Sequence, residues 1–311
     1  YENKVLPFSK GINIIYGSNG VGKTSIVEGI SYLLIGKSFR NVKDSEVLKD
    51  NQDYFSVVGE INSNKYVIYF DNNGKKISKN QNQYSRISDF VGENCLVSFS
   101  PEDLRMIDGG PSEKRKFMDV CLCQIDQEYL KNLSMYNKIL KERNQLLKNY
   151  KDDDSNSTLL EIINNKIIDY GKVIIKKREE FINKIKNNVE KYMDYLSNTK
   201  DTVEITYKPK VYINTYEKEL FMRKEHDIFL ETTTIGPHRD DILVNINKKE
   251  AESCASQGQK RSFVLALKLS FYDLLIEMKK NSLVILDDVF SELDDKKKNN
   301  LLNYINENIQ T

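Results

Sequence analysis

Two groups of residues, far apart in the sequence, have the types and spacing needed to bind a nucleoside triphosphate. The first fits the pattern G-x-x-x-x-G-K-[ST] and consists of Gly17, Ser18, Asn19, Gly20, Val21, Gly22, Lys23 and Thr24. Its glycines let the backbone turn tightly, so that N–H groups at a helix N-terminus face an anion. We expect Lys23 to reach the β- and γ-phosphates and Thr24 to bind Mg²⁺, with Ser25 ending the phosphate-binding segment. A glycine-rich turn that binds nothing is the alternative.

The second group is a pair of carboxylates that follows a short apolar run. Residues 283–286 read Leu-Val-Ile-Leu and lead directly into Asp287 and Asp288. Such a run predicts the strand that completes a nucleotide site. We expect Asp287 to hold Mg²⁺ and Asp288 to orient the attacking water, a positioning role that needs no raised pKa. An apolar strand ending in solvated aspartates remains the alternative.

A third stretch opens an amphipathic helix between these two groups. Its residues are Ser256, Gln257, Gly258, Gln259, Lys260 and Arg261. Ser256 is a suitable N-cap, and Gly258 leaves room for close backbone approach. The residues alone favour an ordinary capped core helix. A second anion-accepting helix N-terminus also suggests that it caps the γ-phosphate bound to another subunit, so that two subunits enclose two ATP molecules.

Two further stretches keep two interpretations each. His238 and Arg239 lie between a Gly-Pro turn and the carboxylates Asp240 and Asp241. They suit either a binding site or a hydrogen-bonded turn into a strand. Residues 36–40, Gly-Lys-Ser-Phe-Arg, form a cationic turn that suits nucleotide or DNA contact or a solvated loop.

Composition sets limits on these hypotheses. The 311 residues carry 47 Lys and Arg against 46 Asp and Glu, a formal net charge of +1. This balance argues against a protein that coats polyanions over its whole surface, but it allows a local basic face. No apolar run approaches a membrane-spanning length. The four cysteines match neither a zinc site nor a disulfide framework, and with only two histidines we expect no structural metal and a reducing, cytoplasmic compartment.

Hydrophobic periodicity predicts the elements that position these residues. We expect strands at 12–15, in antiparallel hairpins over 54–79, and at 94–99, 203–207, 211–213, 242–246 and 283–286. We expect helices at 25–34, 111–116 and 221–230, and two long antiparallel helices over 127–196 broken at 152–157. Cations along the long pair suit either a solvated face or a DNA-contacting face: Lys131, Lys138, Lys141, Arg143, Lys148, Lys172, Lys176, Lys177 and Arg178.

Taken in this order, the motifs resemble the ABC-type ATPase heads of the SMC and RecF group. The wider chain resembles the RecF family, most specifically in Gly236-Pro237-His238-Arg239-Asp240-Asp241, and also at 99–104, 111–115, 256–261 and 286–294. The resemblance implies an α/β fold: an ABC-type P-loop ATPase head, with a mixed sheet and an antiparallel β layer, plus an inserted α-helical lobe. We place the head at 1–99 and 231–311, and the lobe at 100–230.

The resemblance also implies roles and partners. Residues 256–261 take the signature role, and Ser291 to Asp294 take that of a loop that contacts the partner subunit. Proteins of this family are ATP-dependent homodimers that bind duplex DNA near single-strand gaps, hydrolyse ATP slowly, and act with RecO and RecR in recombinase loading, DNA repair and the SOS response. The family pattern includes a strand before Tyr1 and a switch residue after Thr311, so we expect this sequence to bind ATP better than it hydrolyses it. A P-loop enzyme acting on a small molecule, and an interaction protein that uses ATP only as structural glue, remain alternatives.

Overall fold

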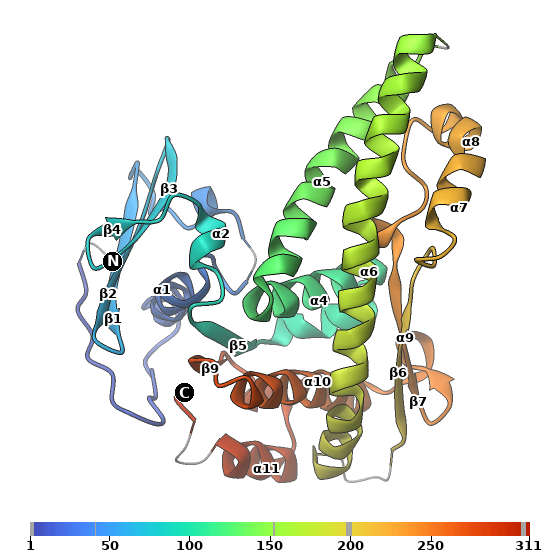
Figure 1. Cartoon of the computed structure of the whole chain (residues 1–311). Helices are drawn as coiled ribbons and strands as arrows, with labels where there is room; N and C mark the ends of the chain where they lie inside the picture. Colours follow the sequence, from blue (N-terminus) through green and yellow to red (C-terminus); the bar gives the residue numbers. More distant parts are fainter. Residues whose placement is uncertain (1–2, 41, 152, 197–200, 306–308) are drawn as a thin grey trace. The chain divides into compact units, whose positions relative to one another are not determined.

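The computed structural model describes residues 3–40, 42–151, 153–196, 201–305 and 309–311, and they form two compact units (Figure 1). The first unit contains residues 1–103, 192–200 and 261–311, and the second contains 104–191 and 201–260. Residues 231–260, which the sequence analysis placed in the head, therefore group with the helices. Compact units need not coincide with domains, so the head and lobe boundaries stay a prediction.

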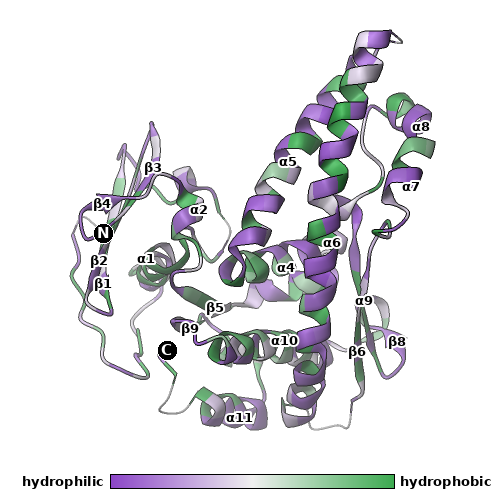
Figure 2. Cartoon of the chain, viewed as in Figure 1, coloured by the Kyte–Doolittle hydropathy of each residue, from purple (hydrophilic) through white to green (hydrophobic). Residues whose placement is uncertain are grey.

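A parallel strand pair lies at the centre of the first unit. Strand β5 (Cys95–Phe99) pairs with β9 (Ser282–Leu286), with Cys95 opposite Ser282 and Phe99 opposite Leu286, which confirms both predicted strands. Along most of its length β5 is hydrophobic (Figure 2). Strands buried on both faces have this composition. The pair brings together two segments that are nearly 190 positions apart in sequence.

Helix α1 (Lys23–Ile35) packs against this strand pair. The buried residues of the contact come from α1, from the turn after it, and from both strands: Leu34, Ile35, Phe39, Leu96 and Ile285. This cluster packs α1, which follows the glycine-rich loop, against β9, which leads directly into Asp287. The core therefore positions the two predicted halves of the nucleotide site.

An antiparallel sheet covers another side of α1. Its strands, in spatial order, are β1 (Phe55–Ile61), β2 (Asn64–Asp71), β3 (Gly74–Lys79) and β4 (Asn82–Gln83). The register pairs Ile61 with Asn64 and Asp71 with Gly74, and Asn62 and Ser63 have φ of 49° and 61°. Positive φ at both central residues is typical of a tight hairpin turn. The predicted hairpins are confirmed.

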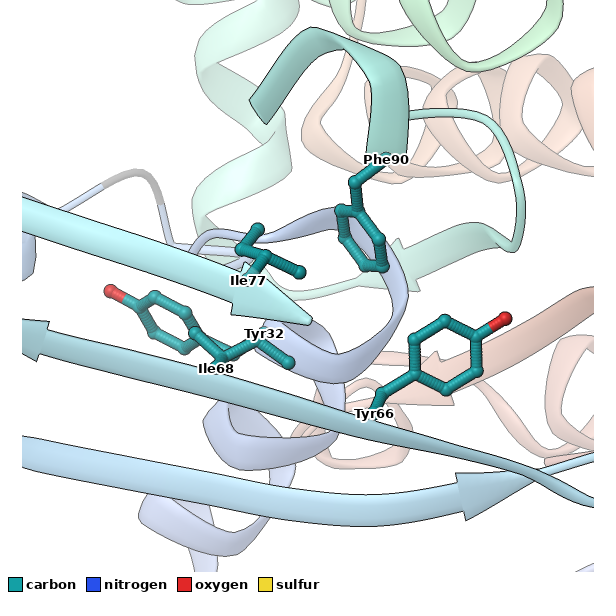
Figure 3. Close-up of a cluster of buried hydrophobic side chains, with 5 residues drawn as sticks. All are labelled: Tyr32, Tyr66, Ile68, Ile77 and Phe90. Atoms are coloured by element: carbon teal, nitrogen blue, oxygen red, sulfur yellow. The ribbon is translucent and has the colours of Figure 1, made fainter. Parts of the chain in front are cut away.

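A buried aromatic cluster joins this sheet to α1 and to the short helix α2 (Ile87–Phe90). Figure 3 shows its side chains, which are Tyr32, Tyr66, Ile68, Ile77 and Phe90. The Tyr66 and Phe90 rings meet edge to face at 6.0 Å between centroids. Gly59 of β1 permits close approach to the helix, since a Cβ there would lie 2.4 Å from a methyl carbon of Leu33.

Helix α10 (Gln257–Glu277) begins in the second unit and continues in the first, where most of its side chains are buried. Lys268 is 7% exposed and donates to the carbonyl of Ser98, and its Nζ lies 2.5 Å from a carboxylate oxygen of Asp103. Helix α11 (Asp295–Ile305) follows the loop at 291–294. Tyr304 of α11 and Tyr192 each donate a 2.6 Å hydrogen bond to Asp273 of α10.

The second unit contains the long helical hairpin that the sequence predicts. Helices α5 (Gln127–Lys148) and α6 (Asp154–Leu196) run antiparallel, and the last residues of α6 belong to the first unit. Hydrophobic and hydrophilic residues alternate along both helices (Figure 2). The apolar stripe of α6 is buried, with Ile167, Ile174 and Val189 fully covered. An amphipathic period over many turns produces this arrangement.

Smaller elements complete the second unit. They are α3 (Arg105–Asp108), α4 (Pro111–Ile125), α7 (Tyr216–Met222), α8 (Lys224–Phe229), α9 (Ala251–Cys254) and a sheet of β6 (Val203–Lys208), β7 (Asp241–Ile246) and β8 (Lys249–Glu250). Strands β6 and β7 are antiparallel, with Lys208 opposite Asp241. The strands predicted at 203–207 and 242–246 and the helices at 111–116 and 221–230 are therefore present, within a few residues.

Two predicted strands are wrong. The described residues 3–22 contain no strand, and Ile14 is 79% exposed. A strand needs a hydrogen-bonded neighbour along its length, whereas the backbone bonds between this segment and the rest of the chain join Asn13 N to Thr311 O and Thr311 N to Gly11 O. Residues 211–213 form a turn in which Val211 is buried and Tyr212 exposed. In neither segment does β propensity supply a pairing partner.

The interpretation of the hairpin cations as one exposed face also needs correction. Arg143 and Arg178 are among the largest fully buried side chains, and Lys177 pairs with Asp126 at 2.8 Å. These three cations neutralise carboxylates of the protein itself. In the part of the chain that the structure describes, no helix has the length and apolar character to span a membrane.

Candidate nucleotide-binding site

The glycine-rich loop leads into α1 without any side-chain cap. The helix begins at Lys23, and its N-cap is Gly22, which has φ of 90°. Gly20 has φ of 83°, and only glycine adopts such values at little cost. Within the described first turn there is no acidic residue and no side-chain hydrogen bond to the cap. The positive end of the helix dipole is thus left for a ligand, and an anion is the ligand it favours.

Lys23 folds back over the loop. Its Nζ donates to the carbonyl of Gly17 at 2.8 Å and to that of Ser18 at 2.9 Å. An ammonium group has three donors, so one remains for a phosphate oxygen. Thr24 and Ser25 follow in the first turn of α1, with Thr24 partly buried and Ser25 exposed.

Asp287 and Asp288 come directly after β9. The N–H of Asp287 donates to the carbonyl of Phe99 at 2.9 Å, which fixes this residue at the carboxyl ends of both strands. Asp288 has φ of 53°, and the Ser291 hydroxyl donates to its carbonyl at 2.8 Å. Asp tolerates this left-handed conformation better than most residues. The turn therefore directs two consecutive carboxylates away from the strand end.

A carboxylate that the sequence analysis missed lies beside Asp287. Glu28 is 5% exposed on α1 and accepts hydrogen bonds from Ser38 Oγ at 2.8 Å and from Arg40 Nη2 at 3.1 Å. Burial raises the pKa of Asp287, the Arg40 charge opposes this rise, and Glu28 and Asp288 add to it. The cationic turn at 36–40 therefore closes onto α1 instead of being a solvated loop. The only sequence signal for this contact was a charged residue, Glu28, on the face of α1 that is buried in the structure.

The predicted signature stretch begins with a capping box. The N–H of Gln259 donates to Ser256 Oγ at 3.2 Å, and the N–H of Ser256 donates to Gln259 Oε1 at 3.0 Å. This reciprocal pair satisfies two backbone donors at the start of α10 and confirms Ser256 as the N-cap. Gln257 and Gly258 occupy the first turn between them.

Two second-unit carboxylates hold this capped turn. Asp201, 5% exposed, accepts from the Gln259 side chain at 2.9 Å and from Asn247 at 2.7 Å, both at Oδ1. Lys260 pairs with Asp108 at 2.6 Å. The first unit thus contains the P-loop and the Asp287–Asp288 pair, and the second contains signature residues 256–260.

Comparison with known proteins identifies the family of the chain. A family model described as an AAA domain matches residues 1–311. A DNA replication and repair protein RecF from Thermoanaerobacter sp. strain X514 is 37% identical over 97% of this chain and 87% of its own length. A RecF protein from Streptococcus uberis is 38% identical over 98% and 86%. The chain belongs to the RecF family.

Solved RecF structures carry the same fold. One described as the recombination mediator protein RecF with ATP in the RecFOR pathway superposes with a TM-score of 0.90, is 36% identical, and covers 98% of this chain and 86% of its own. An Smc head domain from Pyrococcus furiosus has a TM-score of 0.51 at 18% identity, which supports the fold alone. Together these matches confirm the predicted ABC-type ATPase head with its helical part.

Residues 236–241, the stretch that the sequence analysis singled out for its resemblance to the RecF family, form a hydrogen-bonded turn. His238 Nε2 lies 3.0 Å from the carbonyl of Thr233 and so must donate to it, which leaves Nδ1 to accept from Tyr136 OH at 2.6 Å. Burial lowers the pKa of His238 to about 4, so the ring is neutral at pH 7. A Cβ at Gly236, which has φ of 124°, would lie 2.5 Å from the hydroxyls of Tyr136 and Tyr216.

Asp240 is the buried centre of the same turn. It is fully covered, accepts from Arg178 Nη1 at 3.2 Å and from the Lys210 N–H at 2.8 Å, and also accepts from the Tyr207 hydroxyl. Arg178 donates to the carbonyl of Pro237 at 2.6 Å and pairs with Asp119 at 2.8 Å. The interpretation as a turn accounts for His238 and Asp240. It leaves Arg239 exposed and without a comparable role.

Proposed function

We propose that the chain binds ATP with Mg²⁺ at the P-loop and the Asp287–Asp288 pair. The observation that carries the proposal is the uncapped N-terminus of α1, with Lys23 over the loop, packed by one core cluster against the strand that ends at Asp287. Hydroxyl and carboxylate oxygens are the ligands that Mg²⁺ prefers. The residues present therefore fit both the nucleotide and the metal.

Each residue has a defined role in this proposal. The backbone N–H groups of residues 17–24 and the Lys23 ammonium bind phosphate oxygens, and Thr24 and Asp287 hold the metal. Mg²⁺ held there would neutralise charge on the phosphates. Burial raises the pKa of Asp287, and a cation at this carboxylate would favour its ionised form. Asp288 orients the attacking water, so hydrolysis depends on positioning and is slow.

The signature turn and the loop after Asp288 support dimerisation. The N-terminal turn of α10, which begins with Ser256 and Gln259, would face a γ-phosphate held by another copy of the chain, and Ser291 to Asp294 form a loop suited to the same contact. Asp294 also accepts from the N–H of Lys297 at 2.9 Å and so begins α11. ATP then joins two subunits, and its hydrolysis separates them.

In the cell, this dimer would act on DNA in the cytoplasm. Family membership supports binding of duplex DNA near single-strand gaps, action with RecO and RecR, and assistance in recombinase loading during DNA repair. The solved RecF relative is described as a recombination mediator of the RecFOR pathway. ATP serves as the switch for DNA binding, and hydrolysis as the timer for release.

The experiment is duplex DNA binding with ATP·Mg²⁺, with ADP and without nucleotide, measured alongside light scattering for the oligomeric state. We expect ATP alone to strengthen DNA binding and to produce a dimer. Lys23→Met abolishes both effects, and Asp288→Asn traps the dimer that wild type resolves. DNA binding that ignores nucleotide would contradict the switch. A monomer at every nucleotide condition would contradict the composite site.

A further inference from the structure

The turn at residues 236–240 is held more rigidly than a connection between two elements requires. Arg178 donates to Pro237, His238 is bonded at both ring nitrogens, and Asp240 is fully buried with three donors. A fourth donor, Arg115 Nη1 of α4, reaches the carbonyl of Asp240 at 2.7 Å. A buried network of this kind fixes the direction of whatever side chain leaves it. Arg239 is the exposed side chain of this turn, and its Nη2 donates a 3.5 Å hydrogen bond to the carbonyl of Thr233.

Two further cations lie next to this turn along the backbone. The Lys210 backbone is bonded to Asp240 at 2.8 Å, and Lys208 is paired in register with Asp241, at the end of β6 where β7 begins (Figure 1). Lys208 and Lys210 are exposed, and Val211 beside them is 1% exposed and anchors the segment. Tyr212, 67% exposed, follows directly. We name Lys208, Lys210 and Arg239 the turn cations.

The carboxylates at this edge pair with buried cations. Asp240 pairs with Arg178, which also pairs with Asp119, and Asp241 lies 3.6 Å from Lys114, which is 6% exposed and also lies 3.4 Å from Glu252. Within the described residues, the turn cations form no ion pair of their own. Their charges are therefore available to an anion from solution, although the whole chain has a formal net charge of only +1.

We propose that the turn cations bind the sugar-phosphate backbone of duplex DNA. This inference rests on the proposed function and names the surface that performs its DNA contact. Exposed cations without base-reading elements suit a contact that positions DNA without regard to sequence. The proposal assigns the phosphate contacts to the turn cations and not to Lys177 and Arg178 of α6, because those two cations pair with the protein's own carboxylates.

The test measures the salt dependence of duplex DNA affinity with ATP·Mg²⁺ for three proteins. They are wild type, a turn variant (Lys208→Gln, Lys210→Gln, Arg239→Gln), and a matched hairpin variant with the same loss of charge (Lys131→Gln, Lys138→Gln, Lys141→Gln). Each phosphate contact contributes about 0.9 to the slope of log affinity against log salt. We expect the turn variant to lower the slope by about 2–3 and affinity at least tenfold, and the hairpin variant to leave both near wild type.

The other outcomes overturn the inference. An unchanged slope in the turn variant shows that DNA binds elsewhere, and an acidic protein would then be the alternative ligand of the turn cations. Equal losses in both variants show a general charge effect with no surface assigned. ATP affinity and the melting temperature of both variants must match wild type. If wild type binds duplex DNA in no nucleotide state, the proposed function fails together with the inference, whereas a normal wild type with an unchanged turn variant refutes the inference alone.

Discussion

The P-loop of the first unit and the turn at 236–240 of the second are both glycine-containing turns beside charged side chains, yet they use polar groups in opposite ways. At the P-loop, the helix has no side-chain cap and Lys23 contacts only exposed backbone carbonyls. At the turn, both ring nitrogens of His238 and both carboxylate oxygens of Asp240 are hydrogen-bonded within the protein.

The difference separates a ligand site from a scaffold. Polar groups that the protein leaves available at a helix N-terminus favour an anion from solution. Polar groups that satisfy one another in the interior specify a geometry, and their loss leaves uncompensated buried charge. Mutations at the P-loop should therefore change binding without changing stability, and mutations within the turn should do the reverse. The predictions below test this contrast.

The largest effect is expected for Arg178→Met. The substitution keeps much of the side-chain volume but leaves Asp240, which is fully buried, without its cation. Breaking one partner of a buried pair costs about 3–5 kcal/mol of unfolding free energy. Urea denaturation measures it. The matched control is Arg239→Met in the same turn, which is exposed and should change stability by no more than about 0.5 kcal/mol. Equal losses in the two variants would contradict the scaffold role.

The pH dependence of stability should reveal His238. Burial lowers its pKa to about 4 from an ordinary value of 6.5, so between these values the unfolded chain takes up a proton that the folded chain refuses. Stability therefore falls as pH drops through this window, by up to about 3 kcal/mol. Urea midpoints measured from pH 7 to 4.5 should decline less in His238→Asn than in wild type.

The other histidine provides the control for this experiment. His226 is exposed, so His226→Asn should keep the wild-type pH profile. Burial raises the pKa of Asp240, and protonation of that carboxyl favours the folded state at low pH, which opposes the histidine effect. The difference between His238→Asn and wild type isolates the imidazole. Parallel profiles for all three proteins would show that the ring is not buried as a neutral group.

At the P-loop, Lys23→Met should lower ATP affinity about 100-fold and leave the melting temperature within error. Hydrogen bonds to charged groups contribute about 1.5–3 kcal/mol, and the lost ammonium also removes its attraction for the phosphates. Titration calorimetry with ATP·Mg²⁺ measures the loss. Lys131→Met, on the exposed side of α5, is the matched control. If Lys23→Met destabilised the protein as much as Arg178→Met, the P-loop could not be distinguished from the turn as a ligand site.

Local signals made much of this fold predictable. The P-loop, the tight hairpins at 62–63 and 72–73 and the helical hairpin each depend on residues close in sequence. Turn residues and hydrophobic periods carry that information directly. The Asp287–Asp288 pair was predictable because an apolar run ending in carboxylates is itself local. At 12–15 the same kind of signal gave a wrong prediction. β-branched residues favour an extended backbone, but they do not show which strand would pair with it.

Long-range pairings were not predictable. Nothing near Arg178 in the sequence indicates that it pairs with Asp240, 62 positions away, or that Glu28 accepts from Arg40 across a turn. From the sequence alone, a charged residue in a helix can be interpreted as exposed or as buried and paired, because its partner is not known. The same limit hid Asp201, which lies 58 positions from Gln259. The residues that orient the candidate sites were therefore missed, while those expected to contact the nucleotide come from local motifs and stay a prediction.

The smallest effect is expected for Asp201→Ala, and it tests whether the signature turn belongs with the ligand sites or with the scaffold. Helix α10, unlike α1, is capped by its own Ser256–Gln259 pair, and Asp201 orients Gln259 through one 2.9 Å bond. Loss of that bond, worth about 1–1.5 kcal/mol, should raise the dissociation constant of the ATP-dependent dimer about tenfold. ATP binding by the monomer should stay unchanged, because Lys23 is unaffected.

Asp201→Asn makes this last prediction specific. Its amide oxygen can still accept from Gln259 and Asn247, so dimerisation should return close to wild type, whereas a requirement for negative charge would leave it impaired. Analytical ultracentrifugation with ATP·Mg²⁺ distinguishes these results. If Asp201→Ala weakens ATP binding by the monomer as much as it weakens dimerisation, the carboxylate supports the fold in general. If only dimerisation changes, the signature turn is a ligand site whose geometry depends on a buried scaffold residue, Asp201.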